Sequence, residues 1–554
     1  MEFDVENLRG RRVTDRASRT SVGDLWERQA WSNPDAIALV GEAGAYESAG
    51  HSRLSYGQAD ALANKVAHAL AAAGLQDGDI AALVCGNSVE ALVVKIGMAK
   101  AGVVAAPMNP AWPADVTAEV LQRIGAKALV SDAEYVPRLQ RVLASVDVPL
   151  LTAIGVGGVA ADGVPGFAEF TQGMPDTEPA TVVCGDDIWQ LLFTSGTSAA
   201  PKAAMLSHHN TYYAALAWSS TFTLGLAHER DAVICSFLPV VFHTADVLMY
   251  AAWLVGGSVV IGRTFDPVQM VSTIGQHRVT MLWAGMPQAV DAVANAIKAD
   301  PGLDVSSLGS VTYGWAPLPE ETYDRLQRAV GHPVRVQSII GMTEVVVAHR
   351  FWLDEYEDLY RRTTPRDNYV GLPSPMLAAR LVDVTTGDVL PMEPGGLGEV
   401  VYRSPALTAG YYLDEVATRE AMKSGWFHTG DLFGYGEANQ RMMVDRLKDV
   451  IKSGGENVSS IRVEAVLRRH EHVAQAAVIA VGHPRWGEAV TAVVEAVPGA
   501  DPDPQEIIEF CKQHLAGYEV PKAVVIVETL PTSVGGKLQK HVIRDSINTS
   551  EIYD

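Results

Sequence analysis

The chain has 554 residues, of which 48% are hydrophobic and 19% charged, and 43 Lys and Arg against 65 Asp and Glu give a formal net charge of −22. This composition is typical of a globular protein and argues against a disordered or fibrous chain, and the length predicts about three or four structural units. The acidic balance disfavours nucleic acid as the main partner, because binding a phosphate backbone requires a basic face.

The four cysteines, Cys85, Cys184, Cys235 and Cys511, are scattered and form no CxxC pair. This pattern argues against a disulfide framework and a zinc knuckle, and it predicts a reducing, cytoplasmic location. The arginine-rich N-terminus is not followed by an apolar segment, so we expect no signal peptide. The longest apolar stretches, such as residues 251–261, are too short to span a bilayer, so we expect no membrane span.

The N-terminal part alternates short apolar runs with helical segments. The runs that predict strands are residues 81–85, 103–107, 128–131 and 233–237. A helix is predicted from about residue 88 to residue 101, directly after the first of these runs. Strands that alternate with helices indicate parallel sheets with both faces covered.

Two later segments lack this periodicity. Residues 155–182, rich in Gly, Ala, Pro and Asp, predict a surface connection. Residues 354–368 carry many charges and predict a mobile loop, with an exposed helix as the alternative. After about residue 446 a compact alternation of strands and helices returns, which predicts a small α+β unit long enough to fold on its own.

The most informative motif is residues 191–202, Leu-Leu-Phe-Thr-Ser-Gly-Thr-Ser-Ala-Ala-Pro-Lys. An apolar strand leads into a hydroxyl-rich turn that ends at Lys202. Hydroxyl and backbone N–H groups bind phosphate oxygens, and the lysine adds a positive charge. The segment is not a Walker A loop, because Pro201 replaces the second glycine and Ala203 replaces Ser or Thr. The alternative interpretation is a polar turn before a helix.

Residues 191–202 resemble the phosphate-binding loop of the adenylate-forming superfamily, which includes acyl-CoA synthetases, firefly luciferase and peptide-synthetase adenylation domains. Further motifs follow in the order of that family and cover essentially the whole chain. They are Gly314-Trp315-Ala316-Pro317-Leu318-Pro319, Gly341-Met342-Thr343-Glu344, Trp426-Phe427-His428-Thr429-Gly430-Asp431, residues 445–457 and residues 531–537. The chain is most similar to a stand-alone acyl-CoA synthetase.

The resemblance implies an α/β fold with two domains. Residues 1–445 would form a large adenylation domain of layered parallel and mixed sheets with helices and a small barrel-like subdomain. Residues 446–449 would be a hinge, and residues 450–554 would form a small, mobile α+β C-terminal domain.

The resemblance also implies the reaction. A carboxylic acid reacts with ATP and Mg²⁺ to give an acyl-adenylate, and CoA then takes the acyl group as a thioester. Because an anion meets a polyanion in the first step, positioning and charge neutralisation should dominate catalysis. Two alternatives stay open: transfer to a carrier-protein thiol or a nitrogen nucleophile, and an inactive relative that only binds nucleotide or acyl-CoA. The sequence leaves the oligomeric state open, a homodimer included.

The family motifs assign residues to parts of the nucleotide. Those implied for the β- and γ-phosphates are Thr194, Ser195, Gly196, Thr197 and Lys202. Those implied for the adenine turn and the next nucleotide-binding motif are Gly314, Trp315, Ala316, Pro317, Gly341 and Met342. Thr343 should contact the α-phosphate, and Glu344 should ligate Mg²⁺, since a hard cation prefers carboxylate oxygen. Asp431 should accept the ribose hydroxyls with Arg446 nearby, the alternative being a surface ion pair.

The C-terminal motifs supply the remaining implied roles. Lys537 should bridge the acyl carboxylate and the α-phosphate during adenylation, although a solvated loop lysine is the alternative. Lys448 matches the hinge position. Gly454 and Gly455 resemble the residues that line the pantetheine tunnel, but they could equally be turn glycines.

His243 belongs to a stretch that flanks the acyl site in the family, and it joins Lys537, Thr343, Glu344 and Lys202 as a candidate catalytic residue. A histidine in an apolar stretch can also be a core residue. Adenylation domains for amino acids place an Asp in this stretch, whereas this chain has Phe242 and His243, which disfavours an α-amino acid as substrate.

Three residues depart from the family pattern: Ala199 replaces a loop glycine, Ile340 replaces an aromatic residue, and Trp315 replaces a small residue. A side chain as large as Trp315 should fill part of the acyl tunnel, so we expect a short or flat acid. The further pocket walls that the resemblance implies are Trp283, Met286, Val345 and Val346.

Overall fold

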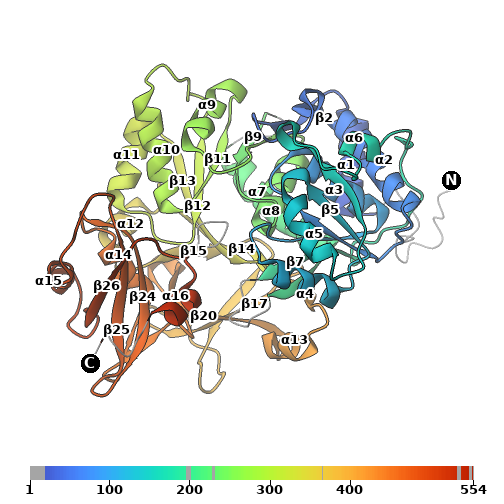
Figure 1. The fold of residues 1–554 in the computed structure, drawn as a ribbon. Helices are drawn as coiled ribbons and strands as arrows, with labels where there is room; N and C mark the ends of the chain where they lie inside the picture. Colours follow the sequence, from blue (N-terminus) through green and yellow to red (C-terminus); the bar gives the residue numbers. More distant parts are fainter. Residues whose placement is uncertain are drawn as a thin grey trace, which may run out of the picture.

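The computed structural model describes residues 19–194, 201–226, 231–364, 366–532, 538–547 and 552. In this part of the chain the strands form three sheets, and Figure 1 shows two of them in a large body and the third in a smaller C-terminal lobe. Among the described helices, none combines the length and the apolar character needed to cross a membrane.

The seven-stranded sheet has the order β18-β8-β7-β4-β3-β5-β6. Its strands are β3 (Ile80–Val84), β4 (Val104–Pro107), β5 (Ala128–Asp132), β6 (Leu150–Ile154), β7 (Ile188–Thr194), β8 (Lys202–Ser207) and β18 (Gly410–Tyr411). The five strands from β7 to β6 are parallel, whereas β8 and β18 pair antiparallel. The parallel pairing predicted from the alternation of strands and helices is confirmed.

The helices of this half lead into β3 or connect the parallel strands of the sheet to one another. They are α2 (Tyr56–Ala72), α3 (Val89–Ala101), α4 (Ala114–Ile124), α5 (Val136–Leu143) and α6 (Phe167–Phe170). Helix α3 begins where the sequence predicted, because the Ser88 side chain accepts a hydrogen bond from the Ala91 N–H and caps the helix. It ends at Gly102, whose φ of +71° terminates the helix in a left-handed conformation.

The second sheet contains fourteen strands and continues through an antiparallel part. Its parallel strands are β1 (Ile37–Gly41), β9 (Val233–Ser236), β10 (Ser258–Ile261), β11 (Met281–Gly285), β12 (Ser310–Gly314) and β13 (Arg335–Met342). Its antiparallel strands are β2 (Arg53–Ser55), β14 (Val345–Trp352), β15 (Tyr369–Pro373), β16 (Ala378–Val382), β17 (Leu397–Arg403), β19 (Met422–Lys423), β20 (Trp426–Tyr435) and β21 (Arg441–Arg446). Strands β14, β15, β16, β17 and β20 bury a hydrophobic core of their own.

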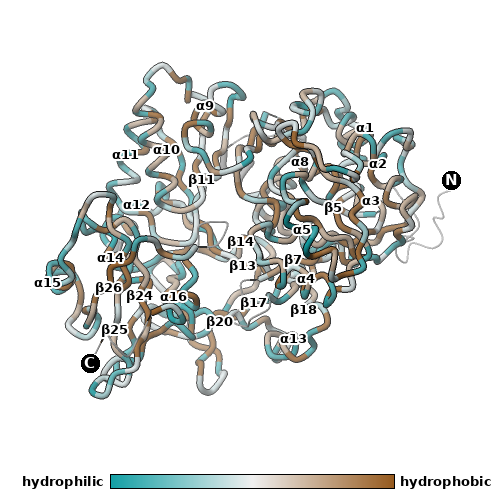
Figure 2. The backbone as a smooth tube through the Cα atoms, in the orientation of Figure 1, coloured by the Kyte–Doolittle hydropathy of each residue, from teal (hydrophilic) through white to brown (hydrophobic). Residues whose placement is uncertain are grey.

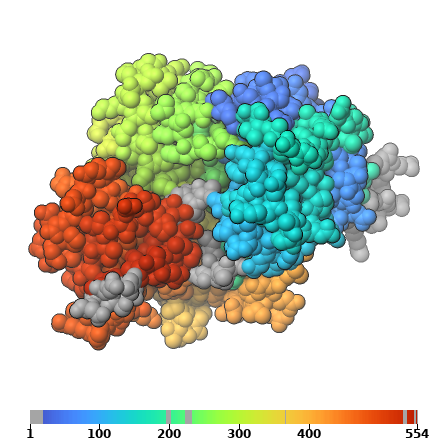
Figure 3. All heavy atoms as spheres, in the orientation of Figure 1, coloured from blue at the N-terminus to red at the C-terminus, as the bar shows by residue number. Residues whose placement is uncertain are grey.

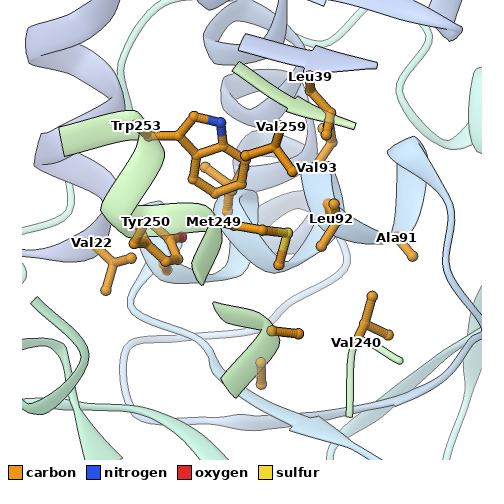
Figure 4. Close-up of a cluster of buried hydrophobic side chains, with 14 of the residues drawn as sticks. Val22, Leu39, Ala91, Leu92, Val93, Val240, Met249, Tyr250, Trp253 and Val259 are labelled. Atoms are coloured by element: carbon orange, nitrogen blue, oxygen red, sulfur yellow. The ribbon is translucent and has the colours of Figure 1, made fainter. Parts of the chain in front are cut away.

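Helices cover this sheet as well. They are α1 (Val22–Ser32), α7 (His208–Leu226), α8 (His243–Leu254), α9 (Pro267–His277), α10 (Pro287–Ala299), α11 (Glu320–Val330), α12 (Glu357–Thr363) and α13 (Glu415–Ala421). Figure 4 shows how α8 is fixed, with Met249 and Trp253 packed among apolar side chains that include Leu92 of α3, Leu39 of β1 and Val259 of β10. Helix α8 is therefore a rigid support for the residues at its beginning.

Two predictions about irregular segments need correction. The charged segment 354–368 is not a loop throughout, because it contains α12, and this helix is not fully exposed, because Leu359, Tyr360 and Thr363 are buried. The surface connection 155–182 is largely irregular as predicted, but it includes the short helix α6 and a 3-10 turn at Val156–Gly158.

The third sheet has the order β23-β22-β25-β24, with β26 paired to β25. Its elements are β22 (Ile451–Ser453), β23 (Glu456–Val458), α14 (Ser460–Leu467), β24 (Val473–His483), β25 (Gly487–Ala496), α15 (Pro504–His514), β26 (Ala523–Val527) and α16 (Lys540–Ser546). These elements bury a separate hydrophobic core, as the predicted α+β unit requires. Figure 2 shows brown, hydrophobic residues along β24 and β26, and Figure 3 shows the orange and red C-terminal lobe beside the yellow-green segment.

Candidate active site

A cleft of about 230 Å³ lies between the second sheet and the C-terminal lobe. One side is formed by residues of β12, β13, β20 and β21, and the other by residues of α14 and α16. The cleft has a charged side and an apolar end. The apolar end contains Trp283, Ile339 and Val347, whereas the charged side contains Asp431 and Arg446.

Asp431 and Arg446 lie opposite one another on the neighbouring strands β20 and β21. The Arg446 Nε atom is 3.6 Å from Asp431 Oδ1, and the Asp431 side chain is buried. The strand before Asp431 is fixed by Glu399, whose carboxylate accepts a hydrogen bond from Gly430 N–H at 2.9 Å and lies 2.7 Å from His428 Nδ1. The structure thus brings the two predicted ribose residues together in the cleft.

The predicted adenine turn follows β12 and forms one wall of the cleft. Gly314, Trp315 and Ala316 contribute to the lining, whereas Pro317 lies outside it. Gly314 is needed for close packing of two strands, because a Cβ atom there would lie 3.0 Å from the Ile339 carbonyl oxygen.

The end of β13 forms the adjacent wall. Ile340 and Gly341 line the cleft, whereas Met342 lies outside the lining. Val347 of the next strand, β14, also lines the cleft. The two valines predicted as acyl-pocket walls, Val345 and Val346, do not line it and pack in the hydrophobic cores.

The phosphate-loop strand ends in an antiparallel pair, in which Thr194 faces Lys202. The loop therefore connects two strands and does not lead directly into a helix. The predicted residues Ser195, Gly196 and Thr197, together with Ala199, lie outside the described residues.

Lys202, Glu344 and Tyr411 form a cluster that joins three distant parts of the chain. The Tyr411 hydroxyl donates a hydrogen bond to Glu344 Oε1 at 2.7 Å, and the Lys202 ammonium lies 5.1 Å from the centre of the Tyr411 ring. Burial raises the pKa of Tyr411 and the nearby Glu344 raises it further, so the hydroxyl keeps its proton and remains a donor. Tyr411 therefore contacts both the Glu344 carboxylate and, through its ring, the Lys202 ammonium.

Glu344 supplies a single buried carboxylate at this cluster. In the described ranges there is no group of three or more His, Cys, Asp or Glu side chains that could hold a metal ion by itself. Such a donor set fits Mg²⁺, because this ion is usually bound through one or two carboxylates together with substrate phosphates.

His243, the first residue of α8, is buried and does not belong to the cleft lining, which contains its neighbour Thr244. Its Nε2 atom lies 3.1 Å from Thr211 Oγ1, and its Nδ1 atom lies 3.2 Å from the Thr343 carbonyl oxygen. Burial lowers the pKa of His243 to about 3, so the ring is neutral. Since the carbonyl only accepts, Nδ1 carries the proton and Nε2 accepts from Thr211.

The chain of hydrogen bonds continues behind His243. Trp189 Nε1 donates to Thr211 Oγ1 at 3.0 Å, and the Lys95 ammonium lies 5.4 Å from the centre of the Trp189 ring. Lys95 is itself buried and forms an ion pair with Asp246 at 2.6 Å. A buried polar network therefore connects β7, the strand of the phosphate loop, to the Thr343 turn.

The predicted hinge lies at the junction between the cleft and the C-terminal lobe. Lys448 lines the cleft, and burial together with the Arg446 charge lowers the pKa of its ammonium. Asp445 accepts hydrogen bonds from Ser460 N–H at 2.5 Å and from the Ser460 hydroxyl at 2.6 Å. The Lys540 ammonium donates to the same hydroxyl at 2.6 Å, so one serine connects β21 to α16 through the start of α14.

Gly454 and Gly455 occupy the two-residue turn between β22 and β23, with φ values of +63° and +91°. A two-residue hairpin with positive φ at both central residues favours glycine for conformational reasons alone. Neither glycine contributes to the cleft lining. Lys537 lies outside the described residues, whereas its neighbour Leu538 lines the cleft.

A second cavity of about 650 Å³ adjoins the cleft, and its lining is mostly apolar. The side chains that line both spaces are Trp283, Met286, Gln288 and Trp315. Trp283 and Met286, which were predicted as walls of the acyl pocket, therefore belong to a partition between two cavities.

Sequence reasoning did not identify Tyr411, Thr211, Glu399 or Lys540. Tyr411 is 67 positions from Glu344, and Thr211 is 32 from His243, so no local pattern connects either pair. The signal that could have drawn attention to Tyr411 is the Gly410-Tyr411 dipeptide, which forms the edge strand β18 beside β8.

Two comparisons of sequence identify the family. The family description "AMP-binding enzyme" matches residues 26–412, and "AMP-binding enzyme C-terminal domain" matches residues 462–537. A feruloyl-CoA synthase of Amycolatopsis sp is 32% identical, covering 94% of this chain and 98% of its own length. The long-chain-fatty-acid–CoA ligase FadD13 of Mycobacterium tuberculosis is 31% identical, covering 96% and 99%.

The fold agrees with solved structures of such enzymes. ATP-bound MatB from Rhodopseudomonas palustris superimposes with a TM-score of 0.79 at 27% identity, covering 95% of this chain and 98% of that one. The agreement of motifs, fold and relatives over almost the whole length confirms the predicted adenylate-forming architecture. The chain belongs to the AMP-binding enzyme family.

Proposed function

We propose that this enzyme is an acyl-CoA synthetase that activates a short, medium-length or aromatic carboxylic acid. The carboxylate oxygen attacks the α-phosphorus of ATP, the α–β phosphoanhydride bond breaks and pyrophosphate leaves. The CoA sulfur then attacks the acyl carbon, the bond from that carbon to the AMP oxygen breaks and AMP leaves. The observation that carries the proposal is a single cleft with the Asp431–Arg446 pair on one side and an apolar end beside it.

The described residues fit distinct parts of this reaction. Asp431 can accept the ribose hydroxyls, while Arg446 and Lys448 add positive charge on the phosphate side. Lys202 can neutralise phosphate oxygens near Glu344. Mg²⁺, held by Glu344 and the phosphates, would supply further charge neutralisation. His243 acts through its hydrogen bond to Thr343 and orients the turn without touching the substrate.

We propose the domain division 1–445, 446–449 and 450–554, with Lys448 at the hinge. The support is that the second sheet ends at β21 and the third begins at β22, with only the residues around Lys448 between them. The location in the cytoplasm, a pantetheine tunnel at Gly454 and Gly455 and a homodimer stay predictions. The alternative acceptor, a carrier-protein thiol or a nitrogen nucleophile, is separated from CoA by the experiment below.

The test is mass spectrometry of reactions that contain ATP, Mg²⁺ and a panel of short, medium-length and aromatic acids, with and without CoA. Detection of an acyl-CoA in the reactions that contain CoA supports the proposal and identifies the acid class. Release of AMP and pyrophosphate without a CoA ester would favour the alternative acceptor. No ATP consumption with any acid in the panel would contradict the proposal.

A variant separates the two half-reactions. Lys537→Ala should abolish adenylate formation but leave thiolysis of a supplied acyl-adenylate largely intact, because the lysine charge is needed while pyrophosphate departs. Lys512→Ala is the matched control, since Lys512 is an exposed lysine of α15 that pairs only with Glu509 in its own helix turn. An equal loss of both half-reactions in Lys537→Ala would refute the assigned role.

A further inference from the structure

Trp315 has an unusual backbone conformation for a large residue. Its φ is +71°, and the Ala316 N–H donates to the Gly314 carbonyl oxygen at 3.0 Å, which spans only two residues. A two-residue hydrogen bond around a residue with this φ is typical of the rare, strained form of the γ-turn. Glycine would adopt this conformation without strain, so the indole is retained at a conformational cost.

The indole side chain lies between the two cavities. Trp315 is 41% exposed although it lies in the interior of the cleft region, because it borders empty space on both sides. Its ring meets the Trp283 ring edge to face, with centroids 6.1 Å apart and an interplanar angle of 88°. Met286 and Gln288 complete this partition.

The two cavities differ in size. The cleft that contains the Asp431–Arg446 pair measures about 230 Å³, and the cavity behind the partition about 650 Å³. Trp283 and Trp315 line the cleft and also border the larger cavity, so they stand between the two spaces. Aromatic rings pack well against indoles in offset or edge-to-face geometry, which suits a flat acid.

We propose that Trp315 is a specificity-determining residue, which closes the acyl end of the cleft and restricts the substrate to short or flat acids. The inference rests on the proposed function and specifies its substrate class. Removal of the indole should connect the cleft to the larger cavity, so that a long apolar chain can enter. Because the added space is mostly apolar, the preference should move toward longer acids and not toward charged ones.

The test measures kcat/KM for pyrophosphate release with butyrate, benzoate, octanoate, dodecanoate and hexadecanoate, in the wild type and in Trp315→Gly. Glycine tolerates the left-handed conformation, so the variant should keep the wild-type fold. We expect the ratio of dodecanoate to benzoate kcat/KM to rise by about tenfold or more. An unchanged ratio, or a wild type that already prefers hexadecanoate, would overturn the inference.

Met376→Gly is the matched control. Met376 also has a positive φ, +68°, and is 45% exposed, but it lines neither cavity. This variant should show the effect of relieving backbone strain without a change in acid preference. A shift as large as that of Trp315→Gly would mean that strain relief, and not the loss of the indole, changes the preference, which would also overturn the inference.

Trp283→Leu provides a second measurement on the same partition, in case Trp315→Gly fails to fold. It should move the preference in the same direction, because Trp283 supplies the other ring of the edge-to-face pair. A change in KM for CoA with an unchanged acid profile would overturn the inference. A wild type that forms no adenylate with any acid would instead refute the proposed function itself, so the two failures are distinguishable.

Discussion

At the scale of single residues, His243 is a buried side chain that contacts the Thr343 turn but does not line the cleft. Both ring nitrogens are occupied, one by Thr211 and one by the Thr343 carbonyl oxygen, and the neutral ring cannot act as an acid near pH 7. Thr211 receives a further hydrogen bond from Trp189. The three side chains therefore fix the orientation of the Thr343 turn.

Thr211→Val tests this chain, because valine keeps the volume of threonine and removes the hydroxyl. Trp189 Nε1 and His243 Nε2 would lose their partner in a buried environment, which costs about 1–3 kcal/mol for an unsatisfied group. We expect a lower melting temperature and a fall of about tenfold in the adenylation rate. Thermal unfolding and ATP–pyrophosphate exchange measure the two effects.

The control for Thr211→Val is Thr221→Val in the same helix, where the hydroxyl donates only to helix carbonyl oxygens. It should have little effect on exchange. If Thr221→Val slowed exchange as much as Thr211→Val, the effect would reflect α7 in general and not the His243 chain.

Tyr411→Phe tests the second residue-scale cluster. The phenyl ring keeps the contact with Lys202, but Glu344 loses its hydrogen bond from the hydroxyl. A hydrogen bond to a charged group contributes about 1.5–3 kcal/mol, so the less restrained carboxylate should bind Mg²⁺ with ATP more weakly. We expect a higher Mg²⁺ concentration at half-maximal pyrophosphate release, and calorimetry should show weaker ATP binding in Mg²⁺ than for the wild type.

Tyr412→Phe is the neighbouring control for Tyr411→Phe, since Tyr412 packs against the hydrophobic core of the first sheet. It should leave the Mg²⁺ dependence unchanged. An unchanged Mg²⁺ dependence in Tyr411→Phe would exclude a role of the hydroxyl in orienting Glu344.

At the scale of secondary-structure elements, the start of α14 connects the lobe to the cleft. Asp445 at the end of β21 accepts from both the N–H and the hydroxyl of Ser460, and Lys540 of α16 reaches the same hydroxyl. A carboxylate beside a helix N-terminus is also favoured by the helix dipole. These contacts span the predicted hinge, so they should stabilise the arrangement of the lobe in this structure.

Ser460→Ala should weaken this connection while it leaves the backbone hydrogen bond to Asp445 in place. The lost hydroxyl contacts involve charged groups, so we expect the melting temperature to fall. If this arrangement is the one that forms the adenylate, adenylation should slow several-fold while thiolysis of a supplied adenylate stays unchanged. Ser272→Ala is the control, because Ser272 donates only to its own helix. Equal slowing of both half-reactions would contradict the prediction.

At the scale of the whole molecule, buried histidines link stability to pH. Burial lowers the pKa of His208, His243 and His349 to about 3, against an ordinary value of 6.5. Below pH 6.5 the unfolded chain therefore binds protons that the folded chain does not. The contribution of these neutral histidines to the free energy of unfolding is complete above pH 6.5. It is lost as the pH falls toward 3, by up to about 1.4 kcal/mol per pH unit for each histidine.

His349→Gln should reduce this pH dependence, because it removes one of the three groups while glutamine can still contact the Tyr402 hydroxyl. The measurement is the melting temperature at pH values from 7 to 4.5, compared with the wild type. His514→Gln, at an exposed position of α15, should follow the wild-type curve. A His349→Gln curve with the wild-type slope would refute the linkage.

The sequence and the structure agree best where local patterns are strong. The strand predicted at residues 128–131 is β5 (Ala128–Asp132), and α3 begins at its serine cap. Helix α12 was predicted only as an exposed alternative to a loop, because its buried side chains are few among charged residues and Arg361 pairs with Glu357 one turn earlier. In the fold, the Tyr360 ring of α12 packs against the Tyr323 ring, and a sequence pattern does not show this contact.

By itself, the sequence determined the family, the order of the motifs and the identities of the charged residues, because these depend on residue types at short spacing. Only the tertiary structure decided that Tyr411 holds Glu344, that His243 does not line the cleft, that Gly454 and Gly455 form a hairpin turn and that Trp315 divides two cavities. The physical reason is that hydrogen bonds, burial and cavity walls join residues far apart in the chain. A one-dimensional pattern does not contain those distances.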